Sequence, residues 1–217
     1  MKIPRLYTLL ALLMVFAVSC NKPDEPNNVS GRFNGHDYVD LGLPSGTLWA
    51  TCNIGANVPE EFGDCFSWGE IEPKGSYIWS NYKFGICPNI TKYNTNPDYG
   101  TVDSLTVLLA VDDAATINWG WYMPTVDQWR ELRDSTTHIW TTQNGVKGML
   151  FTSNNGHSIF LPAPKDSVGV EAGTYWSKSL FESSNLAWGF GFNSVDYGVG
   201  GLERWQGLNV RPVCYSK

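Results

Sequence analysis

Residues 53–100 constrain the fold more than any other part of the chain. This segment is rich in glycine, proline and asparagine, and it carries aromatic residues without a sustained hydrophobic period. A helix would need apolar residues at every third or fourth position, and a half-buried strand would need them at every second position. The sequence therefore predicts long loops, packed by the aromatic side chains of Trp68, Tyr77, Trp79, Tyr82 and Phe84.

Short β-strands are predicted on both sides of this loop segment. Runs of β-branched and aromatic residues alternate there with turn residues such as glycine, proline and asparagine. The expected strands are residues 36–41, 47–52, 149–152, 158–161, 174–179, 188–193 and 208–215. In the run 188–193, Trp188, Phe190 and Phe192 share one face by the period of two, and the other face is mainly glycine.

The first of two predicted helices begins at a pair of aspartates. Asp112 and Asp113 precede two alanines, and acidic residues stabilise a helix N-terminus while alanine propagates the helix. Gly120 is expected to end it. We interpret both carboxylates as helix-opening residues rather than as a general acid and base. Because no hydrolase, zinc-protease or phosphate-loop motif occurs in the chain, catalysis is not expected.

The second predicted helix has the clearest local signal. Thr125 and Gln128 have the spacing of a capping box, in which each side chain bonds to the backbone N–H of the other residue. The helix is expected over residues 126–134. Its buried face should carry Val126, Trp129 and Leu132, and its charged residues should face water.

Composition limits the class of protein and its partners. The chain is 42% hydrophobic, 14% aromatic and 17% charged, with 22 glycines and 10 tryptophans, which excludes a disordered tail, a coiled coil and a collagen-like fibre. Acidic residues outnumber basic residues by 21 to 15. Because this charge repels phosphate backbones, nucleic acid is not an expected partner.

The first 19 residues indicate export. Lys2 and Arg5 precede the uncharged run 6–18, which is too short to span a bilayer as a helix but suits a secretory signal. Small residues and then Cys20 follow, and this pattern resembles a bacterial lipobox, in which the cysteine becomes the lipidated first residue. An ordinary cysteine after a plain signal cleavage is the alternative. We expect a surface-exposed outer membrane lipoprotein that meets the membrane only through its lipid anchor.

Residues 20–35 are expected to form a flexible tether. Residues 21–31 contain no aromatic side chain and cannot bury enough surface to fold. Asp24 and Glu25 resemble the short surface-export signal of Bacteroidetes lipoproteins, and an ordinary solvated linker is the other interpretation. The folded domain is then expected over residues 36–217.

The cysteine and histidine pattern predicts no metal site and no cofactor. Four cysteines follow Cys20, and an even number in an oxidising compartment allows three disulfide connectivities. No pair of cysteines has metal-ligand spacing. The three histidines are scattered singly along the chain: His36, His138 and His157.

Several short segments point to a family by their order along residues 36–217. They are DLGLPSG at 40–46, LWATCN at 48–53, FSWGE at 66–70, DDAA at 112–115, MPT at 123–125, IFLPA at 159–163, YWS at 175–177 and VRPV at 210–213. In this order they closely resemble the Fibrobacter succinogenes major paralogous domain family. That family occurs in secreted and lipid-anchored bacterial proteins. The resemblance implies an α+β, C-type lectin-like fold with small antiparallel sheets, two short helices and long packed loops.

A second resemblance bears on catalysis. Residues 124–132 and 207–213 are similar to formylglycine-generating enzymes, which share the C-type lectin-like fold. Those enzymes use two cysteines close together near the C-terminus, whereas this chain has only Cys214 there. The calcium-dependent sugar motif of C-type lectins matches only Glu25-Pro26-Asn27, in the tether. We expect a non-catalytic binding or adhesin-type module, with a formylglycine-generating enzyme or a purely structural lipoprotein as alternatives.

The C-type lectin-like resemblance also implies a disulfide pairing and a set of core residues. Because the chain ends of such folds lie together in one sheet, it implies a bond between Cys52 and Cys214, which leaves Cys65 to pair with Cys87. The tryptophans within family-matching segments are expected in the core: Trp49, Trp68, Trp129, Trp176 and Trp188.

The expected ligand face consists of loops 181–185 and 196–206, because the C-terminal stretch binds the ligand in related C-type lectin-like proteins. These glycine-rich loops carry Glu182, Asn185, Asp196, Tyr197, Glu203, Arg204 and Trp205. Arg204 and Trp205 are expected to form an exposed anchor for a glycan or protein at the cell surface. Solvated loops without a ligand are the alternative.

Overall fold

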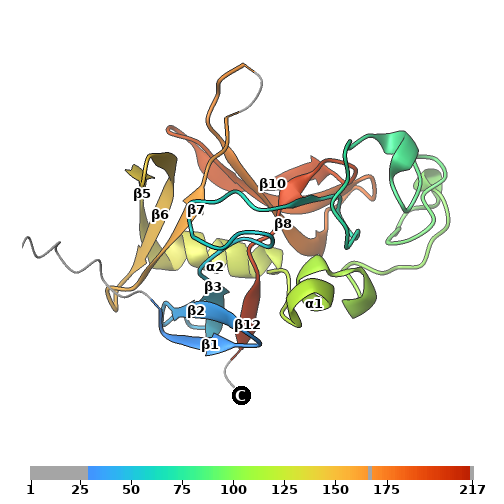
Figure 1. Cartoon of the computed structure of the whole chain (residues 1–217). Helices are drawn as coiled ribbons and strands as arrows, with labels where there is room; N and C mark the ends of the chain where they lie inside the picture. The colour runs from blue at the N-terminus through green and yellow to red at the C-terminus, as the bar shows by residue number, and fades with distance from the viewer. Residues whose placement is uncertain (1–28, 166–167, 216–217) are drawn as a thin grey trace, which may run out of the picture.

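The computed structural model describes residues 29–165 and 168–215 (Figure 1). The expected signal peptide, Cys20 and the first part of the tether lie outside these residues. Within them, the chain forms mainly antiparallel sheets together with two α-helices, in agreement with the expected α+β class.

The first sheet brings the two ends of the domain together. Its strands, in spatial order, are β1 (Gly31–Phe33), β2 (His36–Asp40), β3 (Thr47–Ala50) and β12 (Val213–Tyr215). Strand β12 pairs antiparallel with β3 and places Cys214 opposite Leu48. The chain end is thereby fixed against the first strands, below α2 in Figure 1.

This register overturns the expected bond between Cys52 and Cys214. Cys52 lies four residues beyond Leu48, two of them past the end of β3, a separation of up to about 13 Å at about 3.3 Å per residue. The Ile54 N–H donates to the Val210 carbonyl at 3.1 Å, so beyond Cys52 the chain still lies beside residues that precede Cys214, two residues out of the β3–β12 register. A disulfide requires Cα atoms within about 7 Å of each other. All four cysteines of the described chain, including Cys65 and Cys87, are free thiols.

The second sheet has the strand order β10-β9-β8-β11-β4. Its members are β4 (Cys65–Phe66), β8 (Gly173–Leu180), β9 (Leu186–Phe192), β10 (Tyr197–Glu203) and β11 (Leu208–Asn209). The prediction of a loop over residues 196–206 was wrong, because the glycines there belong to a strand paired with β9 along its whole length. The expected strand 208–215 is instead divided into β11 and β12, since Pro212 between them has no N–H to donate.

The third sheet is the meander β5 (Thr136–Gln143), β6 (Val146–Ser153) and β7 (Ser158–Pro162). Helix α2 (Val126–Ser135) runs directly into β5. The capping box is confirmed: the Gln128 N–H donates to the Thr125 hydroxyl at 3.2 Å, and the Thr125 N–H donates to the Gln128 side chain at 2.8 Å. Val126, Trp129 and Leu132 are buried, as expected.

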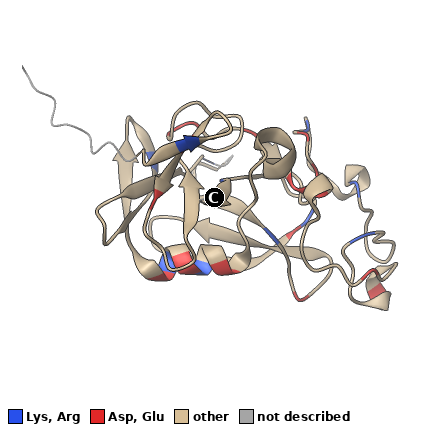
Figure 2. Cartoon of the chain, turned by 90° about the horizontal axis from the view of Figure 1, so that it is seen from below, with Lys and Arg blue, Asp and Glu red and all other residues tan. Residues whose placement is uncertain are grey.

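Helix α2 packs one core between the sheets. The Trp129 ring stacks on Phe190 with centroids 5.0 Å apart and lies 4.8 Å from the Trp49 ring. Figure 2 shows acidic and basic residues alternating along the helix, in keeping with its solvent-facing side. Four of the five expected core tryptophans are fully buried, whereas Trp188 is half-buried beneath the Arg130 guanidinium, 5.0 Å from its ring centroid.

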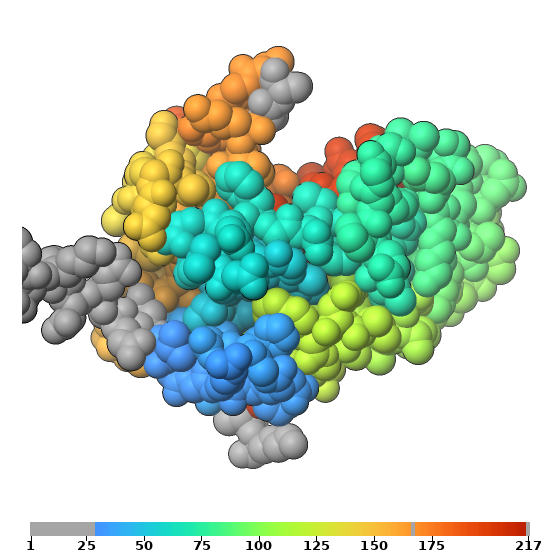
Figure 3. Space-filling model, in the orientation of Figure 1, coloured from blue at the N-terminus to red at the C-terminus, as the bar shows by residue number. Residues whose placement is uncertain are grey.

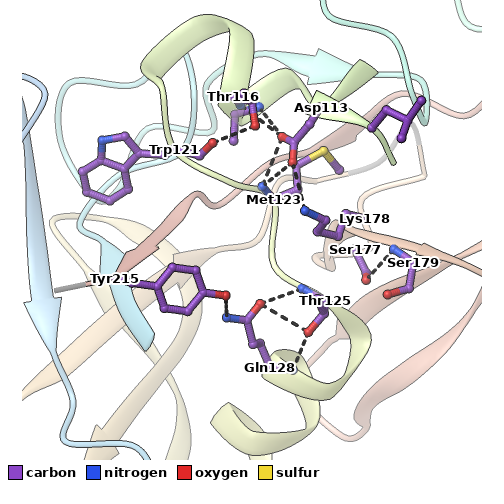
Figure 4. A network of polar contacts seen from close by, with 12 residues as sticks. Asp113, Thr116, Trp121, Met123, Thr125, Gln128, Ser177, Lys178, Ser179 and Tyr215 are labelled. Carbon is purple, nitrogen blue, oxygen red and sulfur yellow. Dashed lines mark hydrogen bonds and ion pairs between the residues drawn. The ribbon is translucent and has the colours of Figure 1, made fainter. Parts of the chain in front are cut away.

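Helix α1 (Ala114–Trp119) begins at Asp113 as expected (Figure 4). The Asp113 carboxylate accepts hydrogen bonds from the N–H groups of Ala115, Thr116 and Met123 at 2.9–3.1 Å. Burial raises its pKa, while these hydrogen bonds and the Lys178 ammonium 3.8 Å away act in the opposite direction. Gly120 ends the helix in the left-handed conformation, which glycine adopts without strain.

The loop prediction for residues 53–100 is confirmed. The segment holds only β4 and the single 3-10 turns η1 (Trp79–Asn81) and η2 (Pro97–Tyr99), and η3 (Ala110–Asp112) follows before α1. The Asp112 carboxylate holds the segment in place. It accepts hydrogen bonds from Lys83 Nζ at 2.6 Å, from Lys92 Nζ at 2.5 Å and from the Tyr93 hydroxyl at 2.7 Å. Asp113 therefore opens α1 as expected, whereas the Asp112 carboxylate does not cap that helix and instead holds the loop segment.

Candidate ligand-binding site

The β9–β10 hairpin has two different faces. The strands pair with Phe190 opposite Val199 and with Gly191 opposite Gly198. Phe190 and Val199 belong to the core that contains Trp129. Because side chains alternate along a strand, the paired glycines lie on the opposite face of the sheet.

Four glycines form a block on that opposite face. Gly191 is paired with Gly198, and the next pair on the same face is Gly189 with Gly200. None of the four has a positive φ. Among the described residues, a Cβ at Gly198 or Gly200 would meet no atom within 4 Å, and one at Gly191 would meet the Thr174 methyl group only at 3.8 Å. In contrast, Gly189 is covered by the Leu202 side chain.

A hollow of about 520 Å³ lies over this block, and we call it the trough. The four glycines line it together with Ala172 and Thr174, with Asn193 and Asp196 at the turn end, and with Leu202 farther along β10. In the space-filling view, a notch opens between the arm that joins β7 to β8 (orange) and the loop segment (green), with residues of the C-terminal strands (red) at its base (Figure 3). The volume falls within the range of about 300–1,000 Å³ that is typical of small-molecule sites.

The trough is nearly uncharged. Among the described residues that line it, Asp196 is the one charged side chain. One Asp196 oxygen accepts from the Tyr197 N–H at 2.8 Å, and the side chain is exposed at the hairpin turn. An anionic ligand would find no cation here, so the site suits a neutral or basic ligand.

Only two of the seven expected ligand residues lie at the trough, Asp196 and Tyr197. The Tyr197 ring, however, packs against the His138 ring of β5 with centroids 4.0 Å apart, so the residue lines the trough through its backbone. The trough therefore includes two of the expected residues, but it does not display the aromatic side chains that were expected of a ligand face.

The other expected residues lie toward the opposite end of the hairpin. Glu182 is exposed, and the Asn185 carbonyl accepts from the Arg204 N–H at 3.4 Å. The half-buried Trp205 donates its indole N–H to Glu203 Oε2 at 2.6 Å. Because the seven-residue strand β10 separates the two groups, the seven residues do not form one ligand face.

Arg204 is not an exposed anchor, and this expectation was wrong. Its side chain is fully buried. The guanidinium donates to the Tyr82 hydroxyl at 2.9 Å and to the carbonyls of Lys92, Tyr93 and Ser184 at 2.8–3.2 Å. The physical reason is that the loop segment has main-chain carbonyls turned inward, and the five N–H groups of a guanidinium can satisfy several of them at once.

The block of glycines was not predicted from the sequence as a candidate site, although the sequence contains the pattern that forms it. Trp188, Phe190 and Phe192 alternate with glycine, and a second glycine-rich run follows after a short polar turn. Glycine weakens a strand interior and marks positions where a ligand or another backbone approaches closely. Pairing the two runs as a hairpin would have placed the glycines side by side.

The described residues contain no cluster suited to a metal ion, and the Cys214 thiol is buried. No group of three or more His, Cys, Asp or Glu residues that could hold a metal occurs among them. Burial raises the pKa of the Cys214 thiol to about 11, so it is protonated at neutral pH. No helix in the described part of the chain is both long enough and apolar enough to cross a membrane.

Comparisons with known proteins add no relative: no family model matches the chain, and neither the curated proteins nor the solved structures contain a match.

Proposed function

We propose that this protein is an exported, lipid-anchored module that binds a glycan or protein ligand at the cell surface without catalysis. In this proposal it belongs to the Fibrobacter succinogenes major paralogous domain family, has a C-type lectin-like fold, and is held on the outer membrane by a lipid on Cys20. The trough on the β9–β10 hairpin is its binding site.

The observation that supports this proposal is the block of glycines that lines the trough. Glycine within a strand costs conformational entropy and leaves no side chain to pack, so a paired strand normally carries it for a reason. A positive φ would be one reason and a close neighbour another; Gly191, Gly198 and Gly200 have no positive φ and no close neighbour within the described part of the chain. Close approach by a molecule from outside the chain is the remaining physical reason, and the trough has room for it.

The state of the C-terminal cysteine supports a non-catalytic function. A formylglycine-generating mechanism needs a reactive thiol, and Cys214 is 1% exposed with a raised pKa. Its strand β12 is paired on β3, away from the trough lining.

The experiment is a screen of the purified protein on glycan and host-protein arrays, repeated with two valine variants. Gly200→Val fills the trough, whereas Gly75→Val adds the same side chain at another position that has no positive φ and no described atom within 4 Å. The proposal expects a saturable ligand that Gly75→Val retains and Gly200→Val loses. Turnover of a thiol substrate, or equal binding by both variants, would contradict it.

The anchor is tested separately by mass spectrometry of the mature protein. Lipidation adds acyl mass to the N-terminal peptide that begins at Cys20, and Cys20→Ser should abolish that mass. A wild-type protein without added acyl mass would indicate a free secreted form.

A further inference from the structure

Glycines elsewhere in this protein lie under aromatic rings of the same chain. A Cβ at Gly201 of β10 would come within 2.9 Å of the Phe181 ring, and one at Gly207 within 2.5 Å of the Tyr77 ring. The same arrangement recurs in three further strands, where Tyr38 covers Gly31, Phe160 covers Gly148 and Phe192 covers Gly173. An aromatic ring packed over a glycine in a strand replaces the contacts that a side chain at that position would make.

Three glycines of the trough lack such a cover. No ring of the described chain lies within 4 Å of a Cβ position at Gly191, Gly198 or Gly200. The block measures about 5 Å across the paired strands and about 7 Å along them, from ordinary strand spacings. This area matches the face of a single aromatic ring system, and the hollow above it is open.

We propose that the trough binds one aromatic side chain of a partner polypeptide, and that basic residues flank this aromatic residue in the partner's sequence. This inference rests on the proposed function and names its ligand. The ring lies flat on Gly191, Gly198 and Gly200, as the rings of Phe181 and Phe192 lie on their own glycines. Asp196, at the turn end, accepts from a phenol or indole hydrogen or pairs with a neighbouring basic residue.

Charge complementarity favours the basic flanks. The chain has a net charge of −6, and the trough lining has one carboxylate and, among its described residues, no lysine or arginine. A basic segment is therefore drawn toward the trough, whereas an acidic one is repelled.

The trough favours a polypeptide over a glycan because it shows no aromatic face. Sugar rings are commonly held by stacking on aromatic side chains, but those of Phe190 and Phe192 belong to the core on the other face of the sheet. The side-chain hydrogen-bonding groups of the lining come from Thr174, Asn193 and Asp196, since the Tyr197 ring packs on His138. The trough thus offers a flat apolar surface on which an aromatic ring of the ligand can pack.

The test measures binding of fluorescein-labelled, end-capped pentapeptides to the full chain by fluorescence anisotropy. The first probe is Gly-Lys-Trp-Lys-Gly; matched probes replace Trp by Leu, or both Lys by Glu. N-acetyltryptophan amide serves as a competitor that reports whether a free aromatic compound suffices. We expect saturable binding of the first probe, and at least tenfold weaker binding of the Leu probe, since a central aromatic contact typically contributes that much.

Two variants locate the binding. Gly200→Val should weaken the Trp probe at least tenfold while the melting temperature stays equal or rises, because a β-branched residue suits an open strand position. Gly75→Val should bind like the wild type. Asp196→Asn should reduce the preference for Lys over Glu flanks without abolishing binding of the ring.

Several outcomes would overturn the inference. They are equal binding of the Trp and Leu probes, no saturation with any peptide, full competition by the free amide at the peptide's own concentration, or unchanged binding by Gly200→Val. If cellohexaose or another array glycan binds and Gly200→Val abolishes that binding, the inference of an aromatic side chain as ligand is wrong, while the proposed function stands. If no ligand of any kind depends on Gly200, both fail.

Discussion

Replacement of Arg204 by methionine should destabilise the protein strongly. The methionine side chain has a similar length and fills the space, but it removes every N–H donor. Tyr82 Oη and the carbonyls of Lys92, Tyr93 and Ser184 would then lose their partner in a site with no exposed surface. The guanidinium also lies 4.9 Å from the Trp68 ring centroid, a contact that methionine only partly replaces.

The magnitude follows from these four hydrogen bonds. A buried acceptor left unpaired costs about 1–3 kcal/mol, so four of them set an upper bound of about 12 kcal/mol. Relaxation, entry of water and the relief of a buried charge reduce this, and breaking a buried charged network typically costs about 3–5 kcal/mol. For a domain of this size that corresponds to a fall in Tm of about 10 °C.

The assay is urea unfolding at pH 7, followed by tryptophan fluorescence, together with a thermal melt. Arg133→Met on the outer side of α2, where the guanidinium bonds only to the neighbouring Asp134, is the matched control and should change stability by less than about 0.5 kcal/mol. Arg204→Lys should fall between, because an ammonium cannot reproduce the planar set of donors. An Arg204→Met midpoint within about 0.5 kcal/mol of the wild type would refute the buried role and return Arg204 to the surface.

Three further predictions concern other parts of the fold. Burial raises the pKa of Asp112, but hydrogen bonds from Lys83, Lys92 and a tyrosine outweigh this effect and hold the pKa below its ordinary value. The ionised Asp112 therefore stabilises the folded protein above about pH 4, and this contribution is lost as the pH falls through the lower pKa of the folded state. Asp112→Asn should therefore lower the free energy of unfolding more at pH 7 than at pH 3, and an equal loss at both would contradict this. Thr125→Ala should cost about 1 kcal/mol through loss of the helix cap, measured by urea unfolding, and an unchanged midpoint would mean that the cap contributes nothing. In the native protein, Cys214 should resist thiol reagents that modify the exposed Cys87, and it should react only after unfolding, so rapid native labelling would count against its burial.

The sequence specified the local elements whose causes are local. The capping box of Thr125 and Gln128, the helix opening at Asp113 and most short strands depend on residues a few positions apart, and the structure has them where they were expected. The irregular segment 53–100 was also predictable, because a missing period is a property of the sequence itself. The broad α+β class followed from these elements.

Only the tertiary structure decided the geometry of the candidate site. Whether Arg204 points to water or inward depends on carbonyls of Lys92 and Tyr93, more than a hundred residues earlier, which no local pattern links to it. The separation of Cys52 from Cys214 depends on the register of β12 on β3, because a shift along a strand moves partners by about 3.3 Å per residue. Likewise, the glycines of the two successive runs form one block only because β9 and β10 pair residue by residue. The register of a strand, and not the identity of a residue, decides which face of the sheet that residue occupies.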